Sequence, residues 1–133
     1  MRVVDASVVA GWLLGETSSP ASRQALEQHL VGEEPLVAPE LLQYEIGNAL
    51  VAGARLPADL ARQAYQHFEA LEIRTYSLGP SEYDAAISLA AKHRLTVYDA
   101  AYVALARALD CRLITADRKL ARALAGLAIA DLA

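Results

Sequence analysis

The chain has 133 residues, which is a usual length for one domain that buries its own hydrophobic core. Its net charge of −4 excludes a protein that holds nucleic acid mainly by bulk positive charge, so binding RNA or DNA would need local cations, a bound metal or a basic partner. The single cysteine excludes an internal disulfide and a cysteine-based zinc site, and it fits a reducing cytosol.

The chain reads as one domain over residues 1–133, because no polar linker, low-complexity tract or internal repeat divides it. No apolar run reaches the roughly 18 residues that a membrane span needs. The apolar amino-terminal segment is interrupted by Asp5 and is followed by no cleavage-like site, so a signal peptide is not expected. We therefore expect a cytoplasmic protein with no membrane contact.

Strands and helices alternate along the chain. Short apolar or alternating segments predict strands at residues 2–5, 35–39, 73–78, 111–115 and 127–132. Helical periodicity, with capping residues and prolines at several helix starts, predicts helices at residues 6–15, 19–32, 40–54, 57–71, 80–94, 94–110 and 117–124. This alternation favours an α/β fold in which helices cover a mostly parallel sheet.

One of the predicted strands ends at an acidic residue, and another is followed closely by one. Asp5 ends the first strand, and Asp117 follows Thr115 at the end of the strand at 111–115. In parallel sheets, ligands collect at the carboxyl ends of the strands. We therefore expect both acids at the edge of the sheet where a site belongs.

Two further acids lie on apolar helix faces. Glu45 shares its face with Leu41 and Leu42, and Asp99 shares its face with Tyr102. Helix capping would explain each aspartate taken singly, because Asp is a favoured N-cap, but it does not explain Glu45. An unpaired carboxylate on such a face destabilises the fold or stays protonated.

A divalent cation would resolve this accumulation of negative charge. Several carboxylates a few ångströms apart cannot all stay ionised without a counter-charge. Oxygen ligands without cysteine or paired histidine point to Mg²⁺ or Mn²⁺ rather than zinc. Such an ion orients water and stabilises the entering and leaving oxygens of a phosphate, so the acids predict phosphodiester hydrolysis.

The segments that carry the acids match a known family. They read "VVDASVV", "PELLQYEIGNAL", "VYDAAYVALA" and "LITADRKL". In this order and spacing they resemble PIN-domain nucleases over essentially the whole chain, and most closely the VapC-type ribonuclease toxins of type II toxin–antitoxin pairs. The resemblance implies a three-layer α/β/α sandwich around a parallel sheet of about five strands. It also implies a Mg²⁺- or Mn²⁺-dependent endoribonuclease that cleaves single-stranded or loop RNA and leaves a 5′-phosphate and a 3′-hydroxyl.

By position, the resemblance makes Asp5, Glu45, Asp99 and Asp117 the catalytic quartet. The three aspartates would ligate the metal, Asp117 either directly or through water, and Glu45 would hold or activate the attacking water. A second group, Ser7, Asn48 and Thr115, matches positions that support the site in the family. For Ser7 and Thr115, a simple turn or cap hydroxyl is an equally good explanation.

The resemblance also implies partners. Such toxins form homodimers and bind an antitoxin whose carboxyl-terminal segment lies in a groove and commonly inserts an arginine near the carboxylates. Candidate contacts to RNA phosphates are Arg94, Arg118 and Lys119, from their proximity to Asp99 and Asp117. Lys119 occupies a position where many relatives carry a further acid, which argues against a second metal ion in the resting state.

Other functions remain compatible with the sequence. One is a PIN-domain nuclease that processes RNA outside any toxin pair, and another is a catalytically inactive PIN-like binding module. A third is a different Mg²⁺ phosphohydrolase on a doubly wound sheet, although "DAS" follows the first strand here instead of the usual D-x-D.

Overall fold

The structure is a computed structural model that describes residues 1–16, 18–127 and 129–133. In these residues, five parallel strands form one sheet in the order β3-β2-β1-β4-β5. The strands are β1 (Arg2–Val4), β2 (Leu36–Pro39), β3 (Arg74–Tyr76), β4 (Arg112–Thr115) and β5 (Ala130–Leu132). The predicted parallel sheet is confirmed.

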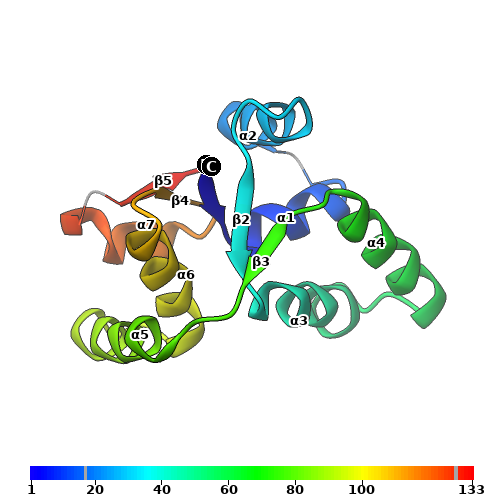
Figure 1. Ribbon diagram of the computed structural model, residues 1–133. Coiled ribbons are helices and arrows are strands. Elements are labelled where there is room, and N and C mark those ends of the chain that lie inside the picture. Colours follow the sequence, from blue (N-terminus) through cyan, green and yellow to red (C-terminus); the bar gives the residue numbers. More distant parts are fainter. Residues whose placement is uncertain (17, 128) are drawn as a thin grey trace.

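Helices cover both faces of the sheet. They are α1 (Ala6–Leu13), α2 (Pro20–Leu30), α3 (Leu41–Asn48), α4 (Ala58–Ala70), α5 (Pro80–His93), α6 (Val97–Ala108) and α7 (Arg118–Ala123). A π-helical turn, η1 (Ala49–Gly53), continues α3, and a 3₁₀ turn, η2 (Ala125–Leu127), follows α7. Figure 1 shows α1 to α4 on one side of the sheet and α5 to α7 on the other, which makes three layers.

The direction of the chain across the sheet changes at β1. From β1 the chain runs to β2 and β3 on one side, and it then crosses to β4 and β5 on the other side. Right-handed crossovers in opposite directions place their helices on opposite faces of the sheet. The carboxyl ends of β1 and β4 therefore flank a topological switch point, which is where open α/β sheets bind ligands.

Strands β1 and β4 and helix α6 form a buried core below this point. Val3, Val4, Leu113 and Ile114 are at most 1% exposed, as expected for parallel strands covered on both faces. Residues 100–106 of α6 are all buried, and α6 packs against β1, β2 and β4. This packing fixes where the helices that follow the strands begin.

The helix predicted over residues 94–110 begins later than the sequence pattern indicates. Arg94 adopts a left-handed conformation with a φ of 54° and ends α5, and α6 starts only at Val97. The Thr96 hydroxyl accepts a hydrogen bond from the Asp99 amide at 3.0 Å and so caps α6. The chain therefore turns between two helices that pack side by side.

Two other elements end or begin at different residues in the structure than the sequence predicts. The helix predicted over residues 40–54 is α-helical only to Asn48 and continues as the π-helical η1. Of the strand predicted over residues 127–132, only Ala130–Leu132 forms β5, and position 128 lies outside the described residues.

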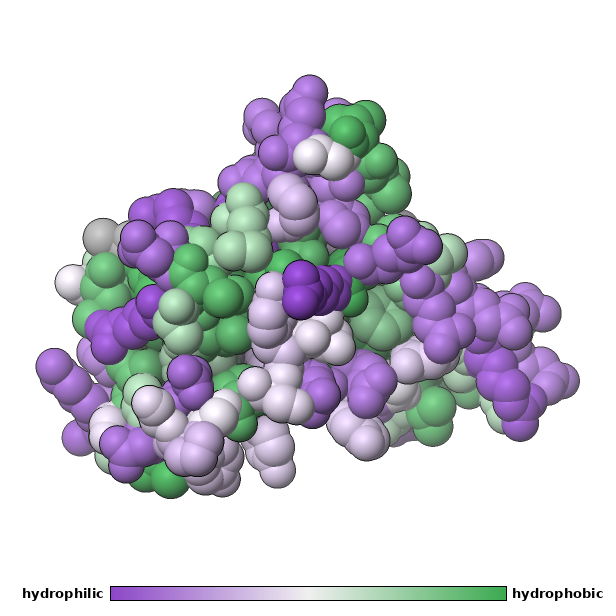
Figure 2. Space-filling view, in the orientation of Figure 1, coloured by the Kyte–Doolittle hydropathy of each residue, from purple (hydrophilic) through white to green (hydrophobic). Residues whose placement is uncertain are grey.

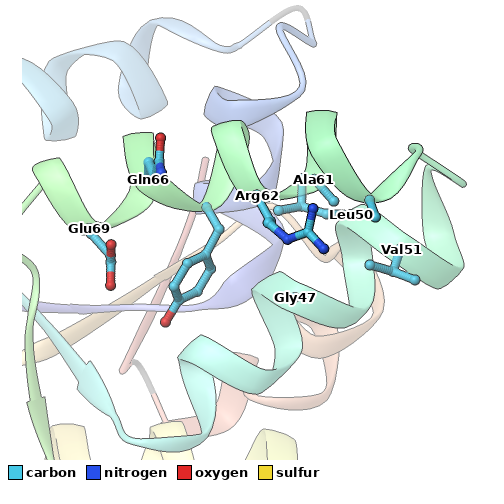
Figure 3. Close-up of a pocket in the computed structure, with 9 residues that line it drawn as sticks. Gly47, Leu50, Val51, Ala61, Arg62, Gln66 and Glu69 are labelled. Atoms are coloured by element: carbon cyan, nitrogen blue, oxygen red, sulfur yellow. The ribbon is translucent and has the colours of Figure 1, made fainter.

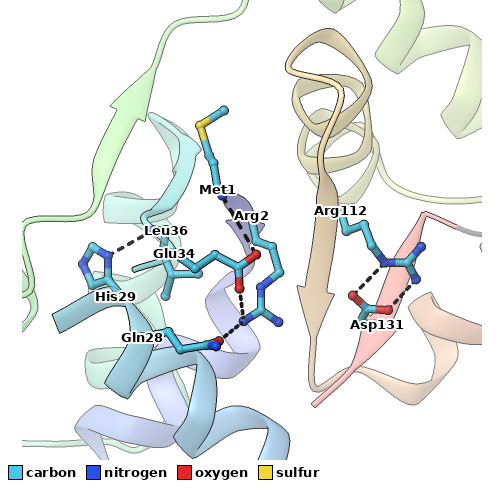
Figure 4. A network of polar contacts seen from close by, with 8 residues as sticks. All are labelled: Met1, Arg2, Gln28, His29, Glu34, Leu36, Arg112 and Asp131. Carbon is cyan, nitrogen blue, oxygen red and sulfur yellow. Dashed lines mark hydrogen bonds and ion pairs between the residues drawn. The ribbon is translucent and has the colours of Figure 1, made fainter. Parts of the chain in front are cut away.

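The amino-terminal edge of the sheet, opposite the switch point, carries a polar network (Figure 4). The Arg2 guanidinium bonds Glu34 at 2.7 Å, and the Arg112 guanidinium pairs with Asp131. The pair of Arg112 and Asp131 joins β4 to β5, and it lowers the pKa of Asp131. These ion pairs sit away from the acids and have a structural role.

His29 connects this edge to α4. Its Nδ1 accepts a hydrogen bond from the Leu36 amide at 3.0 Å, so its Nε2 donates to the Leu71 carbonyl oxygen at 2.6 Å. Both ring nitrogens are thereby used by backbone groups. His29 is a structural residue that holds the end of α2 against the start of β2 and the end of α4.

The surface of the molecule has both hydrophilic and hydrophobic regions. In the view of Figure 2, hydrophilic side chains predominate over α4, and a hydrophobic patch lies at the outer end of α2. Leu30 and Val31, at that end of α2, are 61% and 69% exposed. Among the described residues, no helix combines the length and the apolar character that crossing a membrane requires.

Candidate active site at the carboxyl edge of the sheet

Asp5 lies where β1 ends and α1 begins. Its Oδ1 caps α1 by accepting hydrogen bonds from the amides of Ser7 at 3.1 Å and Val8 at 3.3 Å. The hydroxyls of Ser7 and Thr115 donate to Oδ1 and Oδ2, respectively. Burial raises the pKa of the Asp5 carboxyl, and these hydrogen bonds oppose the rise. Asp5 is therefore a buried acid that the fold holds in one orientation, as well as a cap.

Ser7 and Thr115 connect the ends of β1 and β4. Besides contacting Asp5, the Ser7 hydroxyl oxygen accepts the Ala116 amide at 2.9 Å. The Thr115 hydroxyl oxygen accepts the Asp117 amide at 3.0 Å. The two hydroxyls lie 3.4 Å apart, so one small network fixes Asp5 and the segment that carries Asp117.

Glu45 reaches the same edge from α3. Its Oε1 accepts a hydrogen bond from the hydroxyl of Tyr102 in α6 at 2.9 Å, across a part-buried contact. Burial raises the pKa of Glu45, the bond from Tyr102 opposes the rise, and the charges of Asp99 and Asp5 add to it. Burial and the charge of Glu45 also raise the pKa of Tyr102, so its hydroxyl remains a donor.

Asp99 is half-buried in the first turn of α6. It is not the cap of that helix, because Thr96 fills this role. Burial raises the pKa of Asp99, a hydrogen bond with Thr96 opposes the rise, the charge of Asp117 adds to it, and Lys119 opposes it. Capping therefore explains the position of Asp5 and Asp117 but not that of Asp99.

Asp117 is exposed at the start of α7. Its Oδ1 accepts hydrogen bonds from the amides of Lys119 at 2.8 Å and Leu120 at 3.1 Å, which makes it the N-cap of α7. Its other oxygen, Oδ2, takes no part in these two bonds. Asp117 thus has a capping role and one carboxylate oxygen left for a further contact.

The four carboxylates act on one another electrostatically. The charges of Asp5 and Asp99 reach Glu45, and the charge of Asp117 reaches Asp99. The structure therefore brings together acids from four separate elements: the start of α1, α3, α6 and the start of α7. Like charges in a partly buried region repel one another, and a bound cation would offset this repulsion.

The donor set fits a hydrated cation. Among the described residues, no three His, Cys, Asp or Glu side chains stand close enough together to ligate one ion directly. Mg²⁺ usually keeps several waters and is held by only one or two carboxylates, so direct ligation by three side chains is not required of such a site. The acids present are oxygen ligands of the kind that Mg²⁺ and Mn²⁺ prefer.

The basic residues proposed to contact RNA phosphates differ in how close they lie to the acids. The positive charge of Lys119 lowers the pKa of Asp99, so Lys119 lies beside the acids. Arg118 is exposed at the start of α7, and Arg94 is exposed at the end of α5. Asn48 is exposed at the end of α3, and no hydrogen bond joins it to an acid within the described part of the chain.

Sequence reasoning missed the polar role of Tyr102. It treated this side chain as part of the apolar face of α6, and the ring is indeed 1% exposed. The available signal was a hydroxyl one turn after Asp99, because a buried tyrosine usually finds a hydrogen-bond partner. The partner itself, Glu45, lies 57 residues away in the chain.

Comparison with known proteins identifies the family. A family model described as the PIN domain matches residues 2–125, a range that includes all four acids. The ribonuclease VapC3 of Pyrobaculum aerophilum is 35% identical over 126 residues, which cover 90% of this chain and 91% of that protein. The chain belongs to the PIN-domain family, in its VapC branch.

Further similar proteins support the assignment of this chain to the PIN-domain family. The ribonuclease VapC1 of Mycobacterium tuberculosis is 36% identical over 124 residues, 91% of this chain and 89% of that protein. A toxin–antitoxin complex from Klebsiella pneumoniae has the same fold, with a TM-score of 0.72 and 16% identity over 98% of this chain and 96% of that chain. A crystal structure from Pyrobaculum aerophilum gives a TM-score of 0.69 and 27% identity, and covers 92% and 83% of the two chains. The three-layer α/β/α sandwich that the resemblance implied is confirmed.

The VapC-type chain also has an apolar groove away from its acids. A cavity of about 460 Å³ lies between α4 and the helix formed by α3 and η1 (Figure 3). Its lining consists of Gly47, Leu50, Val51, Ala58, Ala61, Arg62, Tyr65, Gln66 and Glu69. None of the four acids lines this groove, so the groove is distinct from the candidate active site.

Proposed function

We propose that this VapC-type chain is a Mg²⁺- or Mn²⁺-dependent endoribonuclease that acts as the toxin of a toxin–antitoxin pair. The observation that carries the proposal is the convergence of Asp5, Glu45, Asp99 and Asp117 at the switch point of a PIN-domain sheet. The VapC relatives are ribonucleases, which supports the reaction class.

The side chains divide into ligands and a proton acceptor. Asp5 and Asp99 would hold the cation, and Asp117 would bind it directly or through water. When bound, the cation supplies positive charge that orients a water molecule and offsets the charge that develops on the phosphate. Glu45 accepts the proton of the attacking water, because its raised pKa makes it a stronger base than an exposed glutamate. The water oxygen bonds to phosphorus while the bond to the 3′-oxygen of the preceding nucleotide breaks, and that oxygen takes a proton from solvent, which leaves a 5′-phosphate and a 3′-hydroxyl.

Cleavage of RNA by aspartate-to-asparagine variants tests this proposal. Asp5→Asn and Asp99→Asn should abolish Mg²⁺-dependent cleavage while circular dichroism shows a folded protein. Asp84→Asn, at an exposed acid of α5, is the matched control and should cleave like the wild type. Unchanged cleavage by both active-site variants would reject the proposal, and no cleavage of any RNA by the wild type would favour the inactive binding module.

The partner is proposed to be an antitoxin. The solved toxin–antitoxin complex from Klebsiella pneumoniae and the VapC relatives support this choice over an RNA-processing nuclease. The groove of Figure 3 has the apolar lining that an amphipathic helix requires. Val51 lines the groove and is 59% exposed, so Val51→Glu should weaken antitoxin binding without unfolding the protein. Leu60→Glu, at a 49% exposed position of α4 outside the lining, is its control.

The binding test uses the product of an adjacent gene that encodes a DNA-binding protein. Co-purification with the wild type and Leu60→Glu, but not with Val51→Glu, is the expected result. Absence of such a gene and of any stable complex would favour the RNA-processing alternative. A homodimer, which the family resemblance implies, is part of the proposal and would appear in light scattering of the purified protein.

A further inference from the structure

A second cavity adjoins the acids at the start of α6. It has a volume of about 330 Å³, which is within the range of small-ligand pockets. Three tyrosines from different elements contribute to its lining: Tyr76 of β3, Tyr83 of α5 and Tyr98 of α6. We call this cavity the tyrosine pocket.

The tyrosine pocket lies about one helical turn from the pair formed by Glu45 and Tyr102. Leu41 lines the pocket and precedes Glu45 by four residues in α3, and Tyr98 precedes Tyr102 by four residues in α6. Residues four apart are neighbours on one face of a helix. Because Tyr102 donates to Glu45 at 2.9 Å, both walls of the pocket continue directly into the acidic site.

The pocket suits a flat and uncharged ring. Tyr83 and Tyr98 are 53% and 67% exposed, so their rings are accessible in the described structure. Among the described residues that line the cavity there is no Lys or Arg, and the Arg74 guanidinium outside the lining lies 5.0 Å from the centre of the Tyr76 ring, which leaves Tyr83 and Tyr98 as the accessible rings. Aromatic side chains stack on nucleobases irrespective of base identity, and RNA-binding proteins use them to hold unpaired bases.

We propose that the tyrosine pocket binds one nucleobase of single-stranded RNA next to the phosphate that is cleaved. This inference rests on the proposed ribonuclease function. Stacking on Tyr98 or Tyr83 places the base at the pocket, and the connected backbone then extends toward Asp99, which follows Tyr98 in the chain. The negative charge of the protein is compatible with this arrangement, because binding of the base does not depend on phosphate contacts.

The main test compares kinetics of pocket variants on a single-stranded oligoribonucleotide with Mg²⁺. Tyr98→Ala and Tyr83→Ala should each raise KM about tenfold with little change in kcat, because stacking contributes equally before and during the reaction. Tyr98→Phe and Tyr83→Phe keep the ring and should behave like the wild type. Ile87→Ala, at a 49% exposed position of α5 outside the lining, is the control for a lost surface side chain.

An abasic substrate then identifies the contact. Removing one base at the position that occupies the pocket should raise KM of the wild type by a similar factor and should have no further effect on Tyr98→Ala. If the wild type cleaves RNA and both alanine variants keep its KM, the inference is wrong and the proposed function stands. If Tyr98→Ala instead changes the oligomeric state in light scattering and loses activity equally on intact and abasic RNA, the pocket belongs to a protein interface and the inference is wrong.

A different result would show that the proposed ribonuclease function is wrong, and the pocket can still be tested in that case. A wild-type protein that cleaves no RNA would reject the ribonuclease proposal. The pocket would then be tested by the fluorescence of 2-aminopurine in the same oligonucleotide, which stacking on a ring quenches. Quenching by the wild type and Tyr98→Phe but not by Tyr98→Ala is expected, and equal signals from all three proteins would overturn the inference.

Discussion

The Thr115 hydroxyl at the end of β4 donates a hydrogen bond to Oδ2 of Asp5 at the end of β1, although 110 residues separate them in the chain. The same hydroxyl oxygen accepts the Asp117 amide. One buried side chain therefore sets the orientation of one acid and the start of the helix that carries another.

Loss of this hydroxyl should impair catalysis with little loss of fold. Thr115→Val keeps the shape of a side chain that is 0% exposed, and it should lower kcat/KM about 10- to 100-fold, as changes beside metal ligands typically do. Thr115→Ser retains the hydroxyl and should keep most of the activity. Wild-type activity in the valine variant would show that the contact to Asp5 is only structural.

Tyr102 should act through Glu45. Tyr102→Phe leaves the buried ring in place and removes the donor to Oε1, so kcat should fall about tenfold while the free energy of unfolding changes by about 1 kcal/mol. In a double-mutant cycle with Glu45→Gln, the loss in kcat should be far from additive. Additive losses would mean that Tyr102 contributes by another route.

The stability of the metal-free protein should depend on the charge of Asp99. The folded-state pKa of Asp99 is raised, so the stability it contributes is present below its unfolded pKa and is lost as the pH rises through the folded pKa. Asp99→Asn should therefore unfold at higher urea concentration than the wild type at pH 7 in EDTA. This advantage should shrink as the pH falls and disappear below the unfolded pKa of about 3.9, where the carboxyl is protonated in both states.

Added Mg²⁺ should make the wild type more stable than Asp99→Asn. It should raise the melting temperature of the wild type, because a ligand that binds only the folded state stabilises it, and it should leave Asp99→Asn nearly unchanged. An asparagine variant that is less stable than the wild type at pH 7 in EDTA would show that burial of Asp99 is already compensated within the protein.

His29 should contribute to stability and not to cleavage. His29→Phe leaves the Leu36 amide and the Leu71 carbonyl without their partner, and it should lower the free energy of unfolding by about 2 kcal/mol. His67→Phe, at an exposed histidine in α4, should change it by less than about 0.5 kcal/mol. Loss of cleavage in a folded His29→Phe protein would point to a role that the structure does not indicate.

Most of the candidate site could be predicted from the sequence, because its acids interrupt the patterns of apolar residues that mark strands and helices. Asp5 follows an apolar strand, and Glu45 interrupts an apolar helix face, so both stand out without any coordinates. In a sheet of parallel strands, elements that follow strand ends must meet at one edge. Convergence of Asp5, Glu45 and Asp117 is thus a consequence of topology, whereas Asp99 lies in α6, which follows another helix.

Contacts between distant residues could not be predicted in the same way. The bond from Tyr102 to Glu45 depends on how α3 and α6 face each other, which no local pattern records. The sequence does predict separate helices on either side of Arg94, but it starts the second one at Arg94 instead of Val97, because Arg and the following Leu95 are good helix formers. Packing of α5 against α6 imposes the left-handed turn there, with Thr96 as the cap that starts the next helix.

We propose that Asp5, Glu45, Asp99 and Asp117 share one divalent cation. Anomalous scattering from a crystal soaked in Mn²⁺ tests this most directly, because it locates the ion without reference to activity. We expect a peak between Asp5 and Asp99, with Asp117 and Glu45 as direct or water-mediated neighbours, and no such peak in a crystal of Asp5→Asn. A wild-type crystal with bound Mn²⁺ only elsewhere, or with none at millimolar Mn²⁺, would contradict it.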